Sequence, residues 1–264
     1  MKQFIFGSKN SIHIIDLVQT LEMINAALNE IHKCIATGGK ILFVSTKKQA
    51  AGTVASLAKD TSQFYVNHRW LGGMLTNWKT ISNSIRRYKK LSSDLKKENT
   101  GFTKKEILKM GIQRDKLERS LGGISEMIKV PDMIFIIDTN IEELAVKEAL
   151  KLNIPIVAIV DTNSDPTGIN YPIPGNDDAR RAINLYCDLV KETILDAQRN
   201  IPKVSEEELI NSKKKEESNK KEDVSAKENK KKDTPKKKEK IKKVKKLSKT
   251  IISKVKALTS KKSN

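Results

Sequence analysis

Cysteine, histidine, aromatic residues and long apolar runs are all scarce in this chain. Its 264 residues include two cysteines and three histidines, and aromatic residues make up 5%. Because Cys34 and Cys187 lie far apart and form no CxxC motif, we expect neither a disulfide framework nor a cysteine-rich zinc site. No apolar run reaches the roughly 18 residues of a membrane helix, so we expect no membrane span. The scarcity of cysteine fits a reducing compartment, so we expect a cytoplasmic protein.

Motifs for catalysis and for phosphate binding are missing as well. The histidines are scattered, no serine or cysteine lies in a nucleophile-elbow context, and no GxGxxG occurs. Residues 161–165 begin like a calcium-binding loop, but Pro166 and Pro172 stand where that loop needs glycine and glutamate. We therefore expect no enzyme, no cofactor, no metal site and no small-molecule substrate.

Positive charge is concentrated at the C-terminal end. The chain holds 51 lysines and arginines against 32 acidic residues, a net charge of +19, and residues 201–264 alone hold 23 basic and 10 acidic side chains. That segment has too few apolar residues to offset the entropy of ordering, so we expect a disordered basic tail. Within it, residues 241–258 have an amphipathic helical spacing and are expected to fold only on a polyanion.

Residues 1–200 alternate between short apolar runs and segments with helical periodicity. This alternation favours an α/β domain whose parallel sheet is covered on both faces. The prolines of the last apolar run place it at an edge of the sheet, and Asn176 or Asp177 is expected to cap the final helix. The predicted strands are 40–46, 63–67, 133–137, 155–160 and 171–174, and the predicted helices are 11–36, 49–59, 141–152 and a last one after Gly175.

A second helical pattern interrupts this alternation at residues 77–128. Two apolar stripes with spacings of three and four predict an antiparallel coiled-coil hairpin inserted into the domain. Residues 79–129 hold 14 basic and 6 acidic side chains, so we expect the hairpin to project with a basic surface. The stripes are Ile81, Ile85, Tyr88, Leu91 and Leu95 in the first helix, and Ile107, Met110, Leu117, Leu121 and Ile124 in the second.

Two short segments combine residue types that suit anion binding. Residues 68–78 bring two tryptophans, an arginine and a glycine pair together, which fits either phosphate contact or a tight turn with a packed tryptophan. Residues 46–49 follow a predicted strand and open a helix, which fits either anion contact or a solvated helix terminus. The residues alone leave both pairs of alternatives open.

Residues 68–78 also resemble the signature RWLGGTLTNF of the ribosomal protein S-two family of the bacterial small subunit. The resemblance covers about residues 1–200, because further segments resemble other motifs of that family in the same order. The signature positions are Trp70, Gly72, Gly73, Asn77 and Trp78, and the further segments are 43–50, 104–106, 117–124, 131–132, 158–166 and 173–179.

The resemblance implies a flavodoxin-like three-layer domain, residues 1–200, with the inserted coiled-coil hairpin. It also implies a structural role in the small ribosomal subunit without catalysis, contact with ribosomal RNA and other small-subunit proteins, and docking of ribosomal protein S-one. Family members usually carry a further segment before the part that Met1 begins, and the lysine-rich tail is longer than the shared core needs.

Exposed cations are the expected RNA contacts, because phosphates dominate such interfaces. The tryptophans are expected to brace the hairpin root and not to stack on bases. Two rival hypotheses are a small-ligand enzyme or sensor at the strand ends near Asp138 and Asp161, and a DNA-compacting protein led by its tail. The predicted RNA-binding residues are Lys47, Lys48, Arg69, Lys79, Arg86, Arg87, Lys89, Lys90, Lys104 and Lys105.

Overall fold

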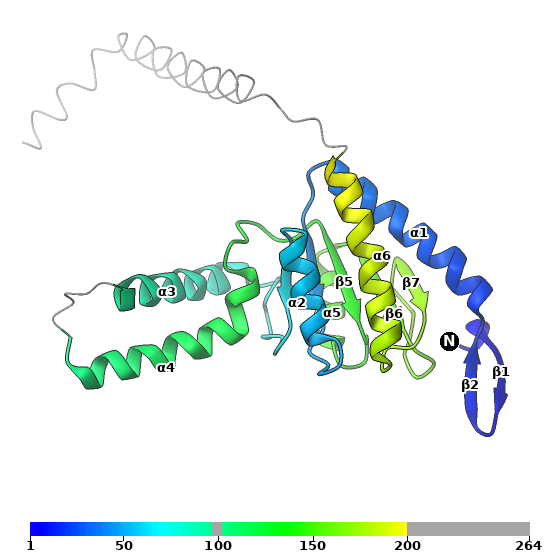
Figure 1. Cartoon of the computed structure of the whole chain (residues 1–264), viewed down its shortest axis with the longest axis horizontal. Helices are drawn as coiled ribbons and strands as arrows, with labels where there is room; N and C mark the ends of the chain where they lie inside the picture. The colour runs from blue at the N-terminus through cyan, green and yellow to red at the C-terminus, as the bar shows by residue number, and fades with distance from the viewer. Residues whose placement is uncertain (97–101, 200–264) are drawn as a thin grey trace, which may run out of the picture. The chain divides into compact units, whose positions relative to one another are not determined.

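Five parallel strands form the centre of the domain in a computed structural model (Figure 1), which describes residues 1–96 and 102–199. The strand order is β4-β3-β5-β6-β7, and every neighbouring pair is parallel. The strands are β3 (Ile41–Val44), β4 (Phe64–Val66), β5 (Met133–Ile137), β6 (Ile156–Val160) and β7 (Tyr171–Pro174).

The burial of the strands explains their sequences. Every residue of β3, β5 and β6 is buried, which is why these segments are continuous apolar runs and do not alternate. Pro172 and Pro174 lie in β7 at one edge of the sheet, as predicted, where fewer ladder hydrogen bonds are lost.

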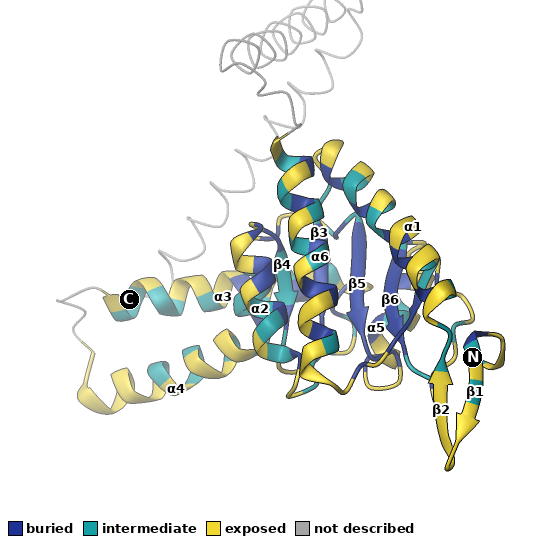
Figure 2. Ribbon diagram, turned by 45° about the vertical axis from the view of Figure 1, so that its right-hand side comes forward, coloured by how far each residue is buried: buried dark blue, intermediate teal, exposed yellow. Residues whose placement is uncertain are grey.

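Helices cover both faces of the sheet, and Figure 2 shows the buried strands between them. One face, with Phe43 and Phe135 at 5.5 Å between ring centroids, packs against α1, α2 and α6. The other face, with Leu42 and Ile134, packs against α5 and the root of the helical hairpin. The predicted flavodoxin-like three-layer architecture is therefore confirmed. The helices are α1 (Leu17–Ala36), α2 (Ala51–Asp60), α5 (Glu143–Lys151) and α6 (Arg180–Arg199).

The N-terminal residues differ from the prediction. A short 3-10 helix, η1 (Lys2–Phe4), leads into an antiparallel pair, β1 (Ile5–Lys9) and β2 (Ile12–Ile15), so the helix predicted from residue 11 is wrong over its first residues. Asn10 and Ser11 have φ of 51° and 64°, the left-handed conformation that tight two-residue hairpins use. Helix α1 begins only after Asp16, whose carboxylate accepts a hydrogen bond from the Val18 N–H.

The insertion between β4 and β5 is the predicted helical hairpin, and it projects from the domain (Figure 1). Its helices are α3 (Trp78–Lys96) and α4 (Lys104–Leu121), and a 3-10 turn, η2 (Gly122–Ile124), follows. Thr103 and Glu106 form a capping box at the start of α4. Ile81 and Ile85 are buried near the domain, whereas Ile107 is 42% exposed, so the seam is closed at the root and open further out.

The hairpin returns to the domain by a close backbone approach at Gly123. A Cβ atom added there would lie 2.1 Å from the carbonyl oxygen of Tyr65 in β4, a distance that no side chain could occupy. Because β4 is an edge strand, η2 also covers backbone that would otherwise be exposed.

The Gly123→Ala substitution is expected to lower the free energy of unfolding by about 1–3 kcal/mol, because β4 or η2 must move to admit the methyl group. Gly111→Ala is the matched control: it lies inside α4 with no atom within 4 Å of the added Cβ, and it should stabilise the helix by up to about 1 kcal/mol. Urea unfolding measures both, and a Gly123→Ala protein as stable as the wild type would contradict the close approach.

The predicted tail, residues 201–264, lies outside the described residues, as does its amphipathic stretch at 241–258. The described residues all belong to the first of the two units, Met1–Ile201 and Pro202–Asn264, into which the chain divides.

Candidate nucleic-acid interface

The loop between β4 and α3 is folded around a single carboxylate, that of Glu148 in α5. The Trp70 Nε1–H donates to Oε1 at 3.0 Å, and the Gly73 N–H donates to the same oxygen at 2.7 Å. The Leu75 N–H donates to Oε2 at 2.9 Å, and Thr76 donates to it from both its N–H at 3.0 Å and its hydroxyl at 3.1 Å. Five donors therefore converge on one side chain more than 70 residues away in the sequence.

These hydrogen bonds keep Glu148 ionised. Burial acts to raise the pKa of Glu148, but the hydrogen bonds from the loop outweigh it and hold the pKa below its usual value of 4.5. Charged acceptors make the stronger kind of hydrogen bond, so the ionised carboxylate fixes the loop more firmly than an amide could.

The signature residues have distinct structural roles in this loop. Trp70 is buried at 6% exposure, and Trp78 is half-buried with its Nε1–H donating to the Ile128 carbonyl at 3.3 Å. Gly73 has a φ of 81°, which favours glycine. Asn77 accepts a hydrogen bond from the Thr80 hydroxyl at the start of α3. A tight turn with a packed tryptophan, one of the two alternatives for this segment, therefore accounts for Trp70, Gly73, Asn77 and Trp78.

Gly72 is the exception, because it is exposed and no atom lies within 4 Å of an added Cβ. Nothing within the described residues explains its lack of a side chain. Arg69 beside the loop is exposed too and has no hydrogen-bond or ionic partner among the described residues.

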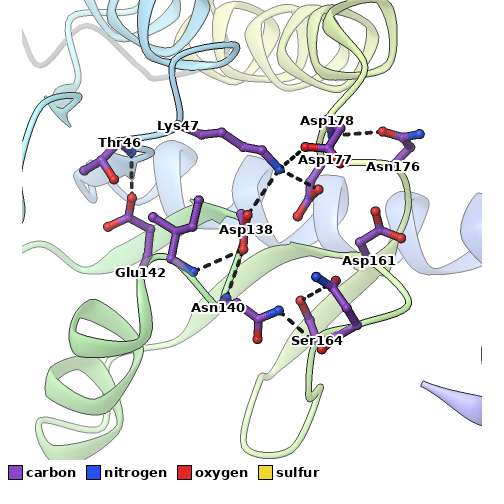
Figure 3. Close-up of polar contacts among 12 residues, drawn as sticks. Thr46, Lys47, Asp138, Asn140, Glu142, Asp161, Ser164, Asn176, Asp177 and Asp178 are labelled. Carbon is purple, nitrogen blue, oxygen red and sulfur yellow. Dashed lines mark hydrogen bonds and ion pairs between the residues drawn. The ribbon is translucent and has the colours of Figure 1, made fainter.

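Lys47 occupies a different position from the one we expected. Figure 3 shows its ammonium among three carboxylates at the ends of the central strands, with Asp138 at 3.2 Å, Asp177 at 2.8 Å and Asp178 at 2.6 Å. Its side chain is only 11% exposed. Burial acts to lower the pKa of Lys47, but the three carboxylates outweigh it and raise the pKa above its usual value. The prediction of an RNA contact at Lys47 therefore receives no support, because its charge is already compensated.

The backbone between β3 and α2 is also held from within the protein. The Thr46 N–H donates to Oε1 of Glu142 at 2.6 Å, and Glu142 is 2% exposed. Asn176 accepts from the N–H groups of Asp178 and Ala179, as expected of a cap, while its neighbour Asp177 binds Lys47 instead. The ends of the strands, where α/β folds usually bind ligands, are therefore filled by the chain's own side chains.

The other predicted RNA-binding residues are exposed, and most of them lie on the hairpin. Three of these cations have partners: Arg86 donates to Asn83, Arg87 donates to Gln113 across the hairpin, and Lys89 pairs with Glu126. Two further exposed lysines of α4, Lys109 and Lys116, were missed, although they recur with Lys105 at helical spacings of four and seven. The exposed predicted residues are Lys48, Arg69, Lys79, Arg86, Arg87, Lys89, Lys90, Lys104 and Lys105.

Replacement of the Glu148 carboxylate by an amide, Glu148→Gln, is expected to lower the free energy of unfolding at pH 7 by about 1–3 kcal/mol, because at least one loop donor loses its acceptor. Since the folded-state pKa lies below 4.5, this contribution is present above pH 4.5 and is lost as the pH falls through the folded-state pKa. Denaturant unfolding across this pH range should therefore show a flatter acid limb for Glu148→Gln than for the wild type.

Glu143→Gln is the control for that measurement, because Glu143 is an exposed residue of the same helix paired with Lys147. It should change stability by less than about 0.5 kcal/mol. Equal effects of the two substitutions would contradict the role of Glu148 in fixing the loop.

Comparison with known proteins identifies the family. The family described as "Ribosomal protein S2" matches residues 1–197. "Small ribosomal subunit protein uS2" of Parvibaculum lavamentivorans is 57% identical over 196 residues, which are 74% of this chain and 78% of the relative. The proteins of the same name from Acidiphilium cryptum and Agrobacterium fabrum are 59% and 56% identical over 196 residues, covering 74% of this chain and 77% of each relative.

These matches define a structural, non-enzymatic protein of the small ribosomal subunit that serves translation in the bacterial cytoplasm. The chain belongs to the ribosomal protein S2 family, so the resemblance in its motifs is confirmed. None of the helices described in residues 1–96 and 102–199 combines the length and apolar character needed to cross a bilayer.

Proposed function

We propose that the chain binds ribosomal RNA mainly through the cations of the α3–α4 hairpin. The observation that carries this proposal is the arrangement of exposed cations in rows. Lys79, Arg86 and Lys90 recur at spacings of seven and four, which places them on one side of α3, opposite the buried Ile81 and Ile85.

A second row of cations, on α4, supports the same proposal of RNA binding by the hairpin. Lys105, Lys109 and Lys116 recur at spacings of four and seven on α4, and all three are exposed. Rows of cations on a projecting element suit the phosphate backbone of folded RNA, which proteins recognise by shape and charge more than by sequence. The filled strand ends argue against the small-ligand enzyme or sensor.

We also propose the division of the chain into the core of residues 1–200, with the hairpin at 77–128, and a separate tail at 201–264. The tail's excess of lysine would add affinity by releasing counterions from RNA, with little choice of sequence. In this proposal the hairpin provides most of the RNA binding and the tail adds to it. In the rival hypothesis the tail provides most of the binding and the nucleic acid is DNA.

The double substitution Arg86→Gln and Lys90→Gln is expected to weaken binding to a small-subunit RNA fragment and to reduce the slope of log affinity against log salt by about 2, since each lost phosphate contact removes about 1. Fluorescence titrations at several salt concentrations measure this. Removing residues 224–264, with 17 lysines and 3 acidic residues, should flatten the slope further in the same titrations.

The matched control is Arg180→Gln with Arg181→Gln, which removes the same charge from two exposed residues at the start of α6. It should leave both affinity and slope close to the wild-type values. If the two double variants lose affinity equally, net charge alone determines binding, and the hairpin has no special role.

We further propose that ribosomal protein S-one docks on the surface formed by β1, β2 and the first turns of α1. Five large apolar side chains there are between 61 and 80% exposed, an unusual concentration for a surface in contact with water. Figure 2 shows β1 and β2 coloured mostly as exposed. Exposed apolar patches of this kind mark protein contacts, whereas RNA contacts are cationic. The five residues are Phe6, Ile12, Leu17, Val18 and Leu21.

Replacing Leu17 and Leu21 with serine is expected to reduce the affinity for purified ribosomal protein S-one at least tenfold, because burial of two leucines contributes about 3 kcal/mol or more. Surface plasmon resonance measures this, with the salt-dependent RNA affinity as a readout that should not change. The control pair is Leu108→Ser and Ile112→Ser, which are 67 and 50% exposed on the hairpin. Undiminished binding of ribosomal protein S-one to the Leu17/Leu21 variant would rule out this surface.

A further inference from the structure

A cavity of about 660 Å³ lies where α2 and the edge strand β4 meet the root of the hairpin. This volume falls within the range of roughly 300–1,000 Å³ that small-molecule sites occupy. The hairpin and the domain both line this cavity. Its first wall is formed by α3, α4 and η2, and its second wall by α2, β4 and the residues that follow β4.

Two aromatic rings line the cavity from opposite walls. Tyr65 belongs to β4 and Tyr88 to α3, and both are half-buried, so part of each ring borders the open space. The Lys59 ammonium lies 5.9 Å from the centroid of the Tyr65 ring, within the range of a cation–π contact. An aromatic ring next to a cation is the arrangement on which unpaired bases and their phosphates bind in proteins.

The charges in the cavity are only partly compensated from within the protein. Lys59 and Arg119 have no carboxylate within 4.0 Å among residues 1–96 and 102–199. The carboxylates in the lining are held by Arg114, which donates two hydrogen bonds to Asp115 and lies 4.0 Å from Glu118. The cavity therefore offers two cations without an ionic partner and, in Glu118, a loosely held acceptor.

We propose that this cavity binds one unpaired nucleotide of RNA, turned out of its helix. Its base stacks on Tyr88 next to the Tyr65 ring, its phosphate is bound by Arg119 and Lys59, and an N–H group of the base edge donates to Glu118. Guanine fits best, because two adjacent N–H donors of its pairing edge can share one carboxylate. Specific recognition of RNA relies on such turned-out bases, since the grooves of paired RNA show proteins little sequence.

This inference rests on the proposed RNA-binding function and adds recognition of a nucleotide to contact with phosphates. It also gives the two walls a common ligand: the domain contributes Lys59 and Tyr65, and the hairpin contributes Tyr88, Glu118 and Arg119. An RNA bound there would hold the hairpin root and the sheet edge together.

The test compares fluorescein-labelled RNA hairpins that are identical except for one bulged nucleotide. The full chain should bind the hairpin with a bulged guanosine at least about fivefold more tightly than the fully paired hairpin, because stacking of one base on an aromatic side chain contributes that much or more. Tyr88→Ala and Arg119→Gln should abolish this preference while leaving binding to the paired hairpin nearly unchanged.

Two control variants separate the cavity from general effects. Tyr88→Phe keeps the ring and should keep the preference, and Arg180→Gln removes an exposed cation of α6 outside the cavity and should keep it too. If Tyr88→Ala fails to fold, it will lose binding to both RNA hairpins. The Arg119→Gln variant, which replaces an exposed residue, then tests whether the preference for the bulged hairpin depends on the cavity.

A second readout is the site of zero-length crosslinking under ultraviolet light. Peptides that contain Tyr88 or Tyr65 should carry the nucleotide adduct, and an adduct on Tyr171 in β7 instead would overturn the proposal. Equal affinity of the wild type for bulged and paired hairpins overturns this inference alone. Failure to bind either RNA overturns the proposed RNA-binding function, and this inference with it.

Discussion

The Glu148 carboxylate is the interaction on which the arrangement of the hairpin depends. Five hydrogen bonds from Trp70, Gly73, Leu75 and Thr76 fix the segment that leads into α3. Without this half-buried anion, the loop donors would have to bind water or rearrange. Because the hairpin emerges directly from this loop, one acidic side chain of a neighbouring helix helps to set its direction, together with the packing of its root on the sheet and the close approach at Gly123.

Ion pairs and hydrogen bonds to carboxylates also fill the ends of the central strands. Lys47 is held by Asp138, Asp177 and Asp178, and Glu142 caps the amide of Thr46, so the usual ligand position of the fold is occupied by the protein itself. Binding is thereby left to exposed surfaces, which is where the cations of the hairpin and the apolar residues near β1 and β2 lie.

Much of the fold could be predicted from the sequence because burial on both faces imposes continuous apolar runs such as β5 and β6. The β1–β2 pair was missed because Ile14 continues the apolar spacing of α1, although the left-handed Asn10 and Ser11 and the Asp16 cap mark where the hairpin turns and the helix begins. Glu148 and the partners of Lys47 could not be predicted, since they lie between 72 and 131 residues away from the groups they bind.

The most direct test of this account is the RNA affinity of the Glu148→Gln chain. Removing a negative charge should strengthen binding to a polyanion if long-range electrostatics alone decide it. If Glu148 positions the hairpin, binding to a small-subunit RNA fragment should instead weaken, by about tenfold, with a reduced salt slope because fewer cations meet phosphates together. Unchanged or tighter binding by a folded Glu148→Gln protein would contradict the central claim.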